Sequence, residues 1–138
     1  MEPYRHKVQY YETDRMGITH HSNYIRWMEE ARVDFLSRIG WDYAKLESLG
    51  VVSPVMSVSC KYRCPTTFDD DVYISVGIKE MRGVRMTIEY TMQKGDGELV
   101  CTAESEHCFL DTSGNIIRLN RDHPEFYAAL SEHINKSE

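Results

Sequence analysis

Residues 10–32 read YYETDRMGITHHSNYIRWMEEAR, and the pattern changes in the middle of this stretch. Its first half is polar and holds a carboxylate, a glycine and two adjacent histidines. From Asn23 to Ile39 apolar residues recur every three or four positions, which predicts one buried face of an amphipathic helix. Ser22 or Asn23 is a suitable N-cap, and Gly40 ends the helix. The stretch therefore predicts a polar loop that leads directly into a long helix.

In much of the rest of the chain apolar and polar residues alternate with a period of two, which is typical of strands. A strand precedes the loop, and a shorter helical or irregular piece at 41–49 separates the helix from the later strands. Strands are expected at 4–11, 55–64, 72–79, 84–92, 98–110 and 116–119, and a last helix starts near Pro124. A strand, a helix and then a run of antiparallel strands indicate an α+β fold. One helix covers one face of such a sheet, so the other face or an edge needs a partner subunit, and we expect a homodimer or larger.

Length and charge limit the classes of function. With 138 residues the chain makes one domain, 1–138. A formal net charge of -6 argues against a nucleic-acid partner, because phosphate binding needs a basic face. The first twelve residues have no apolar segment of signal-peptide type, and no apolar run is long enough to span a membrane. We therefore expect a cytoplasmic protein with no membrane span.

The four cysteines do not have the spacing of a metal site. Cys60 and Cys64 lie four residues apart on an expected strand, which separates them by about 13 Å. Cys101 and Cys108 differ by an odd number and face opposite sides of a regular strand. The adjacent histidines lack a His-Glu-x-x-His pattern. We expect free thiols, no metal and no cofactor.

The loop before the helix has the parts needed for acyl transfer. A helix N-terminus offers unsatisfied backbone N–H groups that stabilise an oxygen gaining negative charge. Asp14 is close enough in sequence to approach a carbonyl docked there, as a base or a nucleophile. A loop aspartate before a helix is also a common cap, turn former or solvated charge, so the pattern alone leaves these alternatives open.

Residues 10–14, Tyr-Tyr-Glu-Thr-Asp, followed by Gly17, His21, Asn23 and Tyr24, resemble the signature of a known family. The run is similar to that of the hotdog-fold acyl-CoA thioesterases of the 4-hydroxybenzoyl-CoA thioesterase type, including the branch associated with the bacterial Tol-Pal system. The likeness extends over nearly the whole chain. It implies a hotdog fold, in which a curved antiparallel sheet wraps a long central helix. It also implies homodimers or homotetramers with active sites at the subunit interface.

The resemblance implies an acyl-CoA substrate and roles for individual residues. Asp14 matches the catalytic carboxylate, and the His21 backbone N–H polarises the thioester carbonyl, with or without help from the imidazole. Coenzyme A is part of the substrate and product. The substrate-binding residues implied by the match, or suited by charge to the phosphates of the coenzyme, are Tyr10, Gly17, Asn23, Tyr24, Lys61 and Arg63.

Three departures from the family pattern border the expected pocket: Glu12 where aspartate is common, Arg15-Met16 where small residues are common, and His20 where an aromatic residue is common. Because of these departures, the sequence does not identify the acyl group of the substrate. Two other functions remain possible on the same fold, a non-catalytic acyl-CoA binding module and a dehydratase acting on β-hydroxyacyl chains.

Overall fold

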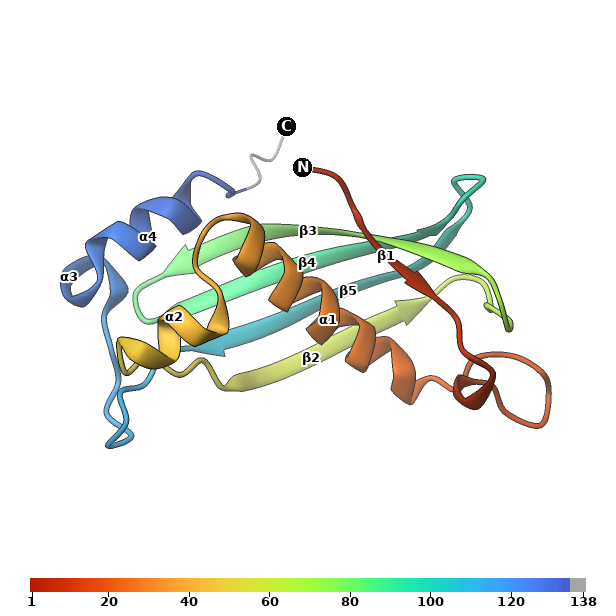
Figure 1. The fold of residues 1–138 in the computed structure, drawn as a ribbon, viewed down its shortest axis with the longest axis horizontal. Helices are drawn as coiled ribbons and strands as arrows, with labels where there is room; N and C mark the ends of the chain where they lie inside the picture. Colours follow the sequence, from red (N-terminus) through yellow and green to blue (C-terminus); the bar gives the residue numbers. More distant parts are fainter. Residues whose placement is uncertain (135–138) are drawn as a thin grey trace.

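The computed structural model describes residues 1–134, which form a five-stranded antiparallel sheet curved around one long helix (Figure 1). The spatial order of the strands is β1-β3-β4-β5-β2. Their bounds are Tyr4–Lys7 for β1, Val55–Tyr62 for β2, Asp71–Arg82 for β3, Arg85–Lys94 for β4 and Leu99–Cys108 for β5. The predicted α+β class is confirmed, and four of the five strands follow the helix along the chain as expected.

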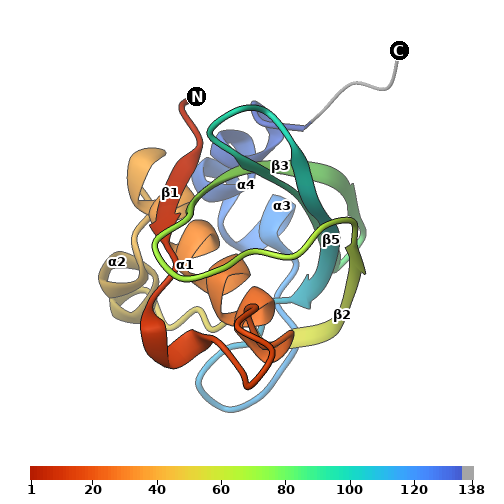
Figure 2. The ribbon, with the colours of Figure 1, turned by 90° about the vertical axis from the view of Figure 1, so that its right-hand side faces the viewer.

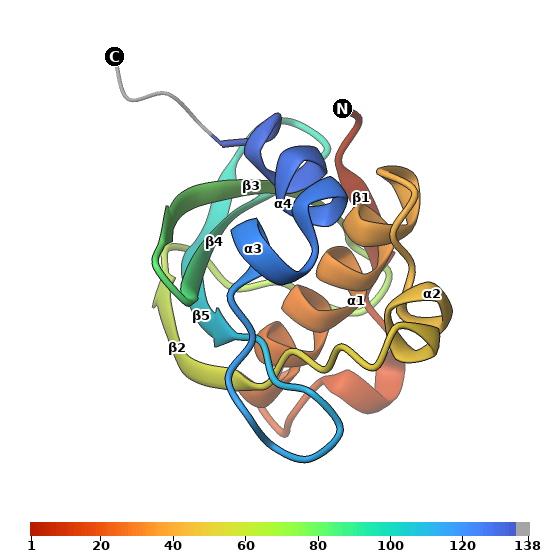
Figure 3. The ribbon, with the colours of Figure 1, turned by 90° about the vertical axis from the view of Figure 1, so that its left-hand side faces the viewer.

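Helix α1, Ser22–Arg38, lies inside the curve of the sheet. Viewed from either end, the sheet curves around α1, with β1 on one side of the helix and β5 and β2 on the other (Figures 2 and 3). The buried stripe of the helix includes Trp27, Met28, Ala31 and Phe35, as the periodicity predicts. The expected cap is wrong: the N-cap residue is His21, and its side chain makes no capping hydrogen bond.

The first predicted strand is too long. β1 ends at Lys7, and a 3-10 turn, η1, occupies Tyr10–Glu12. The Glu12 carboxylate accepts a hydrogen bond from the Gln9 N–H at 2.8 Å, so the backbone turns back on itself. A side chain that bonds to its own local backbone offers the chain an alternative to a strand.

The predicted short strand at 116–119 is absent from residues 1–134. Ile116 makes an isolated bridge with Leu110, and a short helix α3 runs over Leu119–Asp122. The Asp122 carboxylate accepts a hydrogen bond from the Arg118 N–H at 3.1 Å, which favours a helical turn there. Helix α4, Pro124–Ser131, follows at the predicted position.

Helices α2, Tyr43–Ser48, and α4 lie at the opposite end of the molecule from η1 (Figures 1 and 3). The Phe126 ring of α4 is buried against Trp41, with ring centroids 5.0 Å apart. Helices α2 and α4 therefore do not cover the η1 end, where the loop after η1 forms the surface. None of the helices within residues 1–134 combines the length and apolar character needed to cross a membrane.

Uncovered apolar side chains gather along edge strand β2, not on the outer face of the sheet. The outer face carries polar groups such as Lys79 on β3, which pairs with Glu104 on β5 at 3.0 Å. On β2 the exposed fractions are 46% for Val55, 45% for Met56 and 37% for Val58. Of the two surfaces that the sequence analysis considered for a partner subunit, the β2 edge of the sheet is therefore the one with exposed apolar side chains.

Candidate active site

A cleft of about 360 Å³ opens at the η1 end of the molecule. Three segments form it: the loop after η1, the start of α1, and the end of β2 with the residues that follow. The lining residues are Asp14, Met16, Ile18, Thr19, His21, Tyr24, Tyr62, Arg63, Cys64 and Pro65. Four of the eight residues named from the sequence, Asp14, His21, Tyr24 and Arg63, therefore lie around one hollow.

Asp14 sits in a tight loop that closes on itself. Its backbone N–H donates to the Ile18 carbonyl at 2.8 Å, and its carbonyl accepts from the Gly17 N–H at 3.0 Å. One carboxylate oxygen accepts from the Met16 N–H at 2.8 Å. The side chain is half-buried and lines the cleft.

The backbone amides at the start of α1 are not equally available. The Asn23 N–H donates to the His20 carbonyl at 3.0 Å, and the Tyr24 N–H donates to the His21 carbonyl at 3.2 Å. The Ser22 N–H donates to Nδ1 of His20 at 3.2 Å. Within residues 1–134 the His21 N–H has no such acceptor. His21 is thus the residue at this helix end whose amide can serve an oxyanion in the cleft.

Tyr24 and Asn23 make hydrogen bonds that join the segments around the cleft. The Tyr24 hydroxyl hydrogen-bonds with the Thr66 hydroxyl at 3.1 Å, and burial raises the pKa of this phenol above its ordinary value. The Asn23 amide donates to the carbonyls of Glu12 and His20 at 3.0 and 3.1 Å. Asn23 therefore joins the loop to the helix and does not line the cleft.

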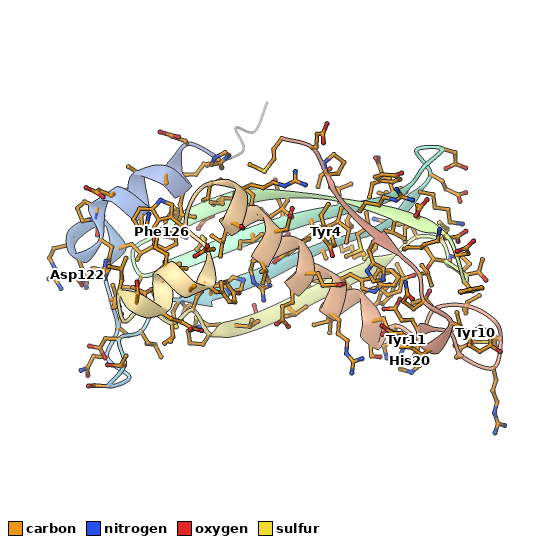
Figure 4. All side chains as sticks on the ribbon, viewed as in Figure 1. Tyr4, Tyr10, Tyr11, His20, Asp122 and Phe126 are labelled. Atoms are coloured by element: carbon orange, nitrogen blue, oxygen red, sulfur yellow. The ribbon has the colours of Figure 1, made fainter. Side chains whose placement is uncertain are left out.

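The other three residues named from the sequence lie outside the lining formed by residues 1–134. Tyr10 is 76% exposed, and its ring contacts Phe68 edge to face at 5.7 Å. Figure 4 shows Tyr10 near Tyr11 and His20 at this end of the molecule. Gly17 has a φ of +79° in the turn between two lining residues, a conformation that favours glycine. Lys61 is exposed on β2.

Sequence reasoning missed the role of Glu12, which is buried beside the loop with 4% of its surface exposed. Burial by itself raises the pKa of this carboxyl, but hydrogen bonds from the Gln9 N–H, His6 and Trp27 outweigh it, so the pKa lies below its ordinary value. The carboxylate is therefore ionised inside the protein. In the sequence, Glu12 stands out only as part of the signature run and as a departure from the family pattern, and neither signal shows that its side chain is buried.

All four cysteines are free thiols, and Cys64 lines the cleft. No group of three or more metal-ligating side chains gathers in the part of the chain that the structure describes. The lining residues that offer reactive or hydrogen-bonding groups include Asp14, His21, Tyr24 and Cys64.

Comparisons with known proteins agree with this fold. The model of the thioesterase-like superfamily matches residues 8–133. A candidate acyl-CoA thioesterase of Bacillus subtilis is 32% identical over 127 residues, covering 91% of this chain and 92% of that protein. The 4-hydroxybenzoyl-CoA thioesterase of a Pseudomonas species is 27% identical over 119 residues, covering 81% of this chain and 84% of that protein.

A solved structure gives the same result in three dimensions. The DHNA-CoA thioesterase of Staphylococcus aureus aligns with a TM-score of 0.87 and 30% sequence identity, covering 94% of this chain and 87% of that one. The family match and the wrapped helix confirm the resemblance that residues 10–24 carry. The chain therefore belongs to the thioesterase-like superfamily and has the hotdog fold.

Proposed function

We propose that this thioester hydrolase cleaves acyl-CoA thioesters in the cleft, with Asp14 as the catalytic carboxylate and the His21 N–H as the oxyanion donor. The observation that carries the proposal is that Asp14 in the loop and His21 at the start of α1 line the same hollow. A carboxylate beside a free amide at a helix N-terminus suits attack on a carbonyl carbon. The relatives named for hydrolysis of CoA thioesters support the choice of substrate.

Two routes lead to the same products. Asp14 attacks the thioester carbonyl to form a mixed anhydride, releases the thiolate of coenzyme A, and water then hydrolyses the anhydride. Alternatively Asp14 takes a proton from water, whose oxygen attacks the carbonyl, and the proton passes to the leaving sulfur. In both routes the carbonyl oxygen gains charge, and one oxyanion donor is worth about 3 kcal/mol in the transition state. His21 also lines the cleft, with its ring centroid 6.5 Å from that of Tyr62, and its imidazole can serve the leaving group.

The surroundings of the cleft suggest how the substrate is held. Arg63 lines the cleft and supplies a positive charge for a phosphate of the coenzyme. Lys61 lies outside the lining and has no role in this proposal. Coenzyme A belongs to the substrate and product, so the reaction needs neither a further cofactor nor a metal. Free thiols in all four cysteines suit a reducing, cytoplasmic location.

A second copy of the chain completes the proposal. β2 is the last strand of the sheet, and the cleft is bordered by Tyr62 at its end and by Arg63 just after it. An apolar edge strand is a ready template for pairing with another strand. Pairing two copies through β2 would cover Val55, Met56 and Val58 and bring the partner to the rim of the cleft. We infer a homodimer, with a homotetramer as the larger assembly.

The proposal is tested by release of free thiol from short-chain, long-chain and aromatic acyl-CoA substrates. A thioesterase releases thiol in step with the free acid. Tight binding without thiol release would instead indicate an acyl-CoA binding module. Loss of water from a β-hydroxyacyl-CoA, with the thioester intact, would indicate a dehydratase. Either of the last two results contradicts the proposal.

A further inference from the structure

The loop that carries Asp14 is fastened at both ends to a single residue. The Glu12 carbonyl accepts hydrogen bonds from the His20 N–H at 2.8 Å and from the Asn23 amide at 3.0 Å. An isolated bridge between Thr13 and Thr19 closes the loop just beyond this point. Glu12 therefore lies at the start of the loop, and its carbonyl binds the residues at the end of the loop.

The Glu12 carboxylate binds three donors from three segments. Nε2 of His6 on β1 lies 2.9 Å from Oε1, and the Gln9 N–H donates to the same oxygen at 2.8 Å. Nε1 of Trp27 on α1 donates to Oε2 at 2.7 Å. Trp27 has no exposed surface, so this contact is fully enclosed. A charged acceptor with three donors is a strong, directional tie between the first strand and the central helix.

His6 extends the tie to a second point on α1. Its Nδ1 lies 3.1 Å from Oε2 of Glu30, and its ring packs on Trp27 with centroids 4.6 Å apart. Glu30 touches His6 but not the loop, which separates its effect from that of Glu12.

We propose that Glu12 is a positioning residue, whose carboxylate fixes the distance between Asp14 and the His21 N–H. This inference rests on the proposed function, in which those two groups perform the reaction. The far side of the loop is held elsewhere: Thr19 bonds to Thr66 and Thr67 donates to the Gly17 carbonyl. Those contacts tie the loop to residues 66–67, whereas the Glu12 side chain ties its entry to α1, the helix that follows His21.

Small displacements at this point matter for rate. Asp14 is two residues from Glu12, and its loop neighbours Arg15, Met16 and Gly17 are exposed, so they add little packing to hold it. A displacement of about 1 Å in a catalytic group costs on the order of a hundredfold in rate. Losing the carboxylate of Glu12 is therefore expected to reduce turnover while leaving the cleft able to bind.

The experiment compares Glu12→Gln, Glu12→Asp and the matched control Glu30→Gln, each in the wild type and in the Asp14→Asn background. Thiol release gives kcat and KM, and near-UV circular dichroism checks folding. Glu12→Gln keeps the shape but loses the charge, and we expect kcat to fall roughly tenfold or more with KM nearly unchanged. Glu12→Asp keeps the charge and retains more activity than Glu12→Gln, although it leaves the larger void. Glu30→Gln stays within about twofold of the wild type.

In the Asp14→Asn background, removing the Glu12 carboxylate has no further effect if Glu12 acts through Asp14. If Glu12→Gln fails to fold, Glu12→Asp carries the test, because its smaller loss of kcat must also vanish in that background. The inference is overturned if kcat of Glu12→Gln equals that of the wild type, if Glu30→Gln loses as much, or if the loss persists without Asp14. Should Asp14→Asn itself keep full activity, the proposed function fails together with the inference.

Discussion

Arg63 and Lys61 are two residues apart in the sequence, yet only Arg63 lines the cleft. Both were reasonable phosphate contacts by charge alone. Asp14, His21 and Tyr24 line the cleft, as the family signature implies, because they lie in one continuous segment next to the helix start. Tyr10 departs from this pattern because its ring contacts Phe68, a residue far along the chain that no local pattern brings near. The resemblance thus implied the residues around the helix end and not the positions that depend on distant contacts.

The contrast between the two cations gives a prediction. Arg63→Gln should raise KM for an acyl-CoA substrate roughly tenfold, about 1.4 kcal/mol, because a charge-assisted contact with a phosphate is lost. kcat should stay near the wild-type value, since Arg63 does not touch the reacting carbon in the proposed reaction. Lys61→Gln serves as the control and should leave both constants within about twofold. Equal effects of the two substitutions on steady-state kinetics would count against the assigned orientation of the coenzyme.

Helix α1 could be predicted from the sequence because its buried stripe repeats with the helical period over 17 residues. Strands β3, β4 and β5 could be predicted from their alternation. The 3-10 turn at Tyr10–Glu12 and the short helix α3 could not, because each depends on a side chain that bonds to nearby backbone: Glu12 in one case and Asp122 in the other. Such contacts leave no periodic trace in a sequence.

A buried polar chain joins α1 to strands β4 and β5. The Arg32 guanidinium donates to the Tyr90 hydroxyl at 3.1 Å, which bonds to the Ser105 hydroxyl at 2.6 Å, which in turn bonds to Nε2 of His107 at 2.7 Å. His107 has no exposed surface. Burial, with a further contribution from the charge of Arg32, lowers the pKa of His107 to about 4. This imidazole is therefore neutral in the folded protein at neutral pH.

The lowered pKa of His107 predicts acid sensitivity. Between about pH 6.5 and pH 4 the imidazole of His107 is protonated in the unfolded chain but neutral in the folded protein. The contribution of His107 to the free energy of unfolding is therefore fully present above about pH 6.5 and is lost as the pH falls toward 4. Between pH 7 and pH 5 this one group should lower the free energy of unfolding by about 2 kcal/mol. Urea unfolding at the two pH values measures the loss. From pH 7 to pH 5, the free energy of unfolding should fall less in His107→Gln than in the wild type, and in the control His123→Gln it should fall as much as in the wild type. Identical losses in all three proteins would refute the assignment.

The exposed apolar edge of β2 bears on how the chain assembles. Val55, Met56 and Val58 are each more than a third exposed on a strand with no neighbour on one side within residues 1–134. The sequence indicated that an apolar surface would need covering, but it could not locate that surface, because the exposure of a strand depends on its place in the sheet. Strand order is a property of the fold and not of local pattern.

If two copies pair through β2, a charge placed there should separate them. Val58→Lys should convert the assembly to single chains, as measured by light scattering coupled to size-exclusion chromatography, and activity should fall with it. Ile116→Lys is the control, since Ile116 is 61% exposed and lies outside β2, and it should change neither property. An assembly unaffected by Val58→Lys would show that copies do not meet at this edge.

The assignment of catalysis to the cleft is tested by comparing Asp14→Asn with Asp69→Asn. Asp69 is a loop aspartate with a φ of 75°, which asparagine tolerates, and its side chain is 65% exposed beside Lys7, outside the cleft lining. The quantities measured are kcat on the best acyl-CoA substrate and the affinity for free coenzyme A. Asp14→Asn should lose roughly a hundredfold or more in kcat with its affinity for coenzyme A retained, whereas Asp69→Asn should match the wild type. A folded Asp14→Asn protein with wild-type kcat would contradict the role of Asp14 and the mechanism built on it.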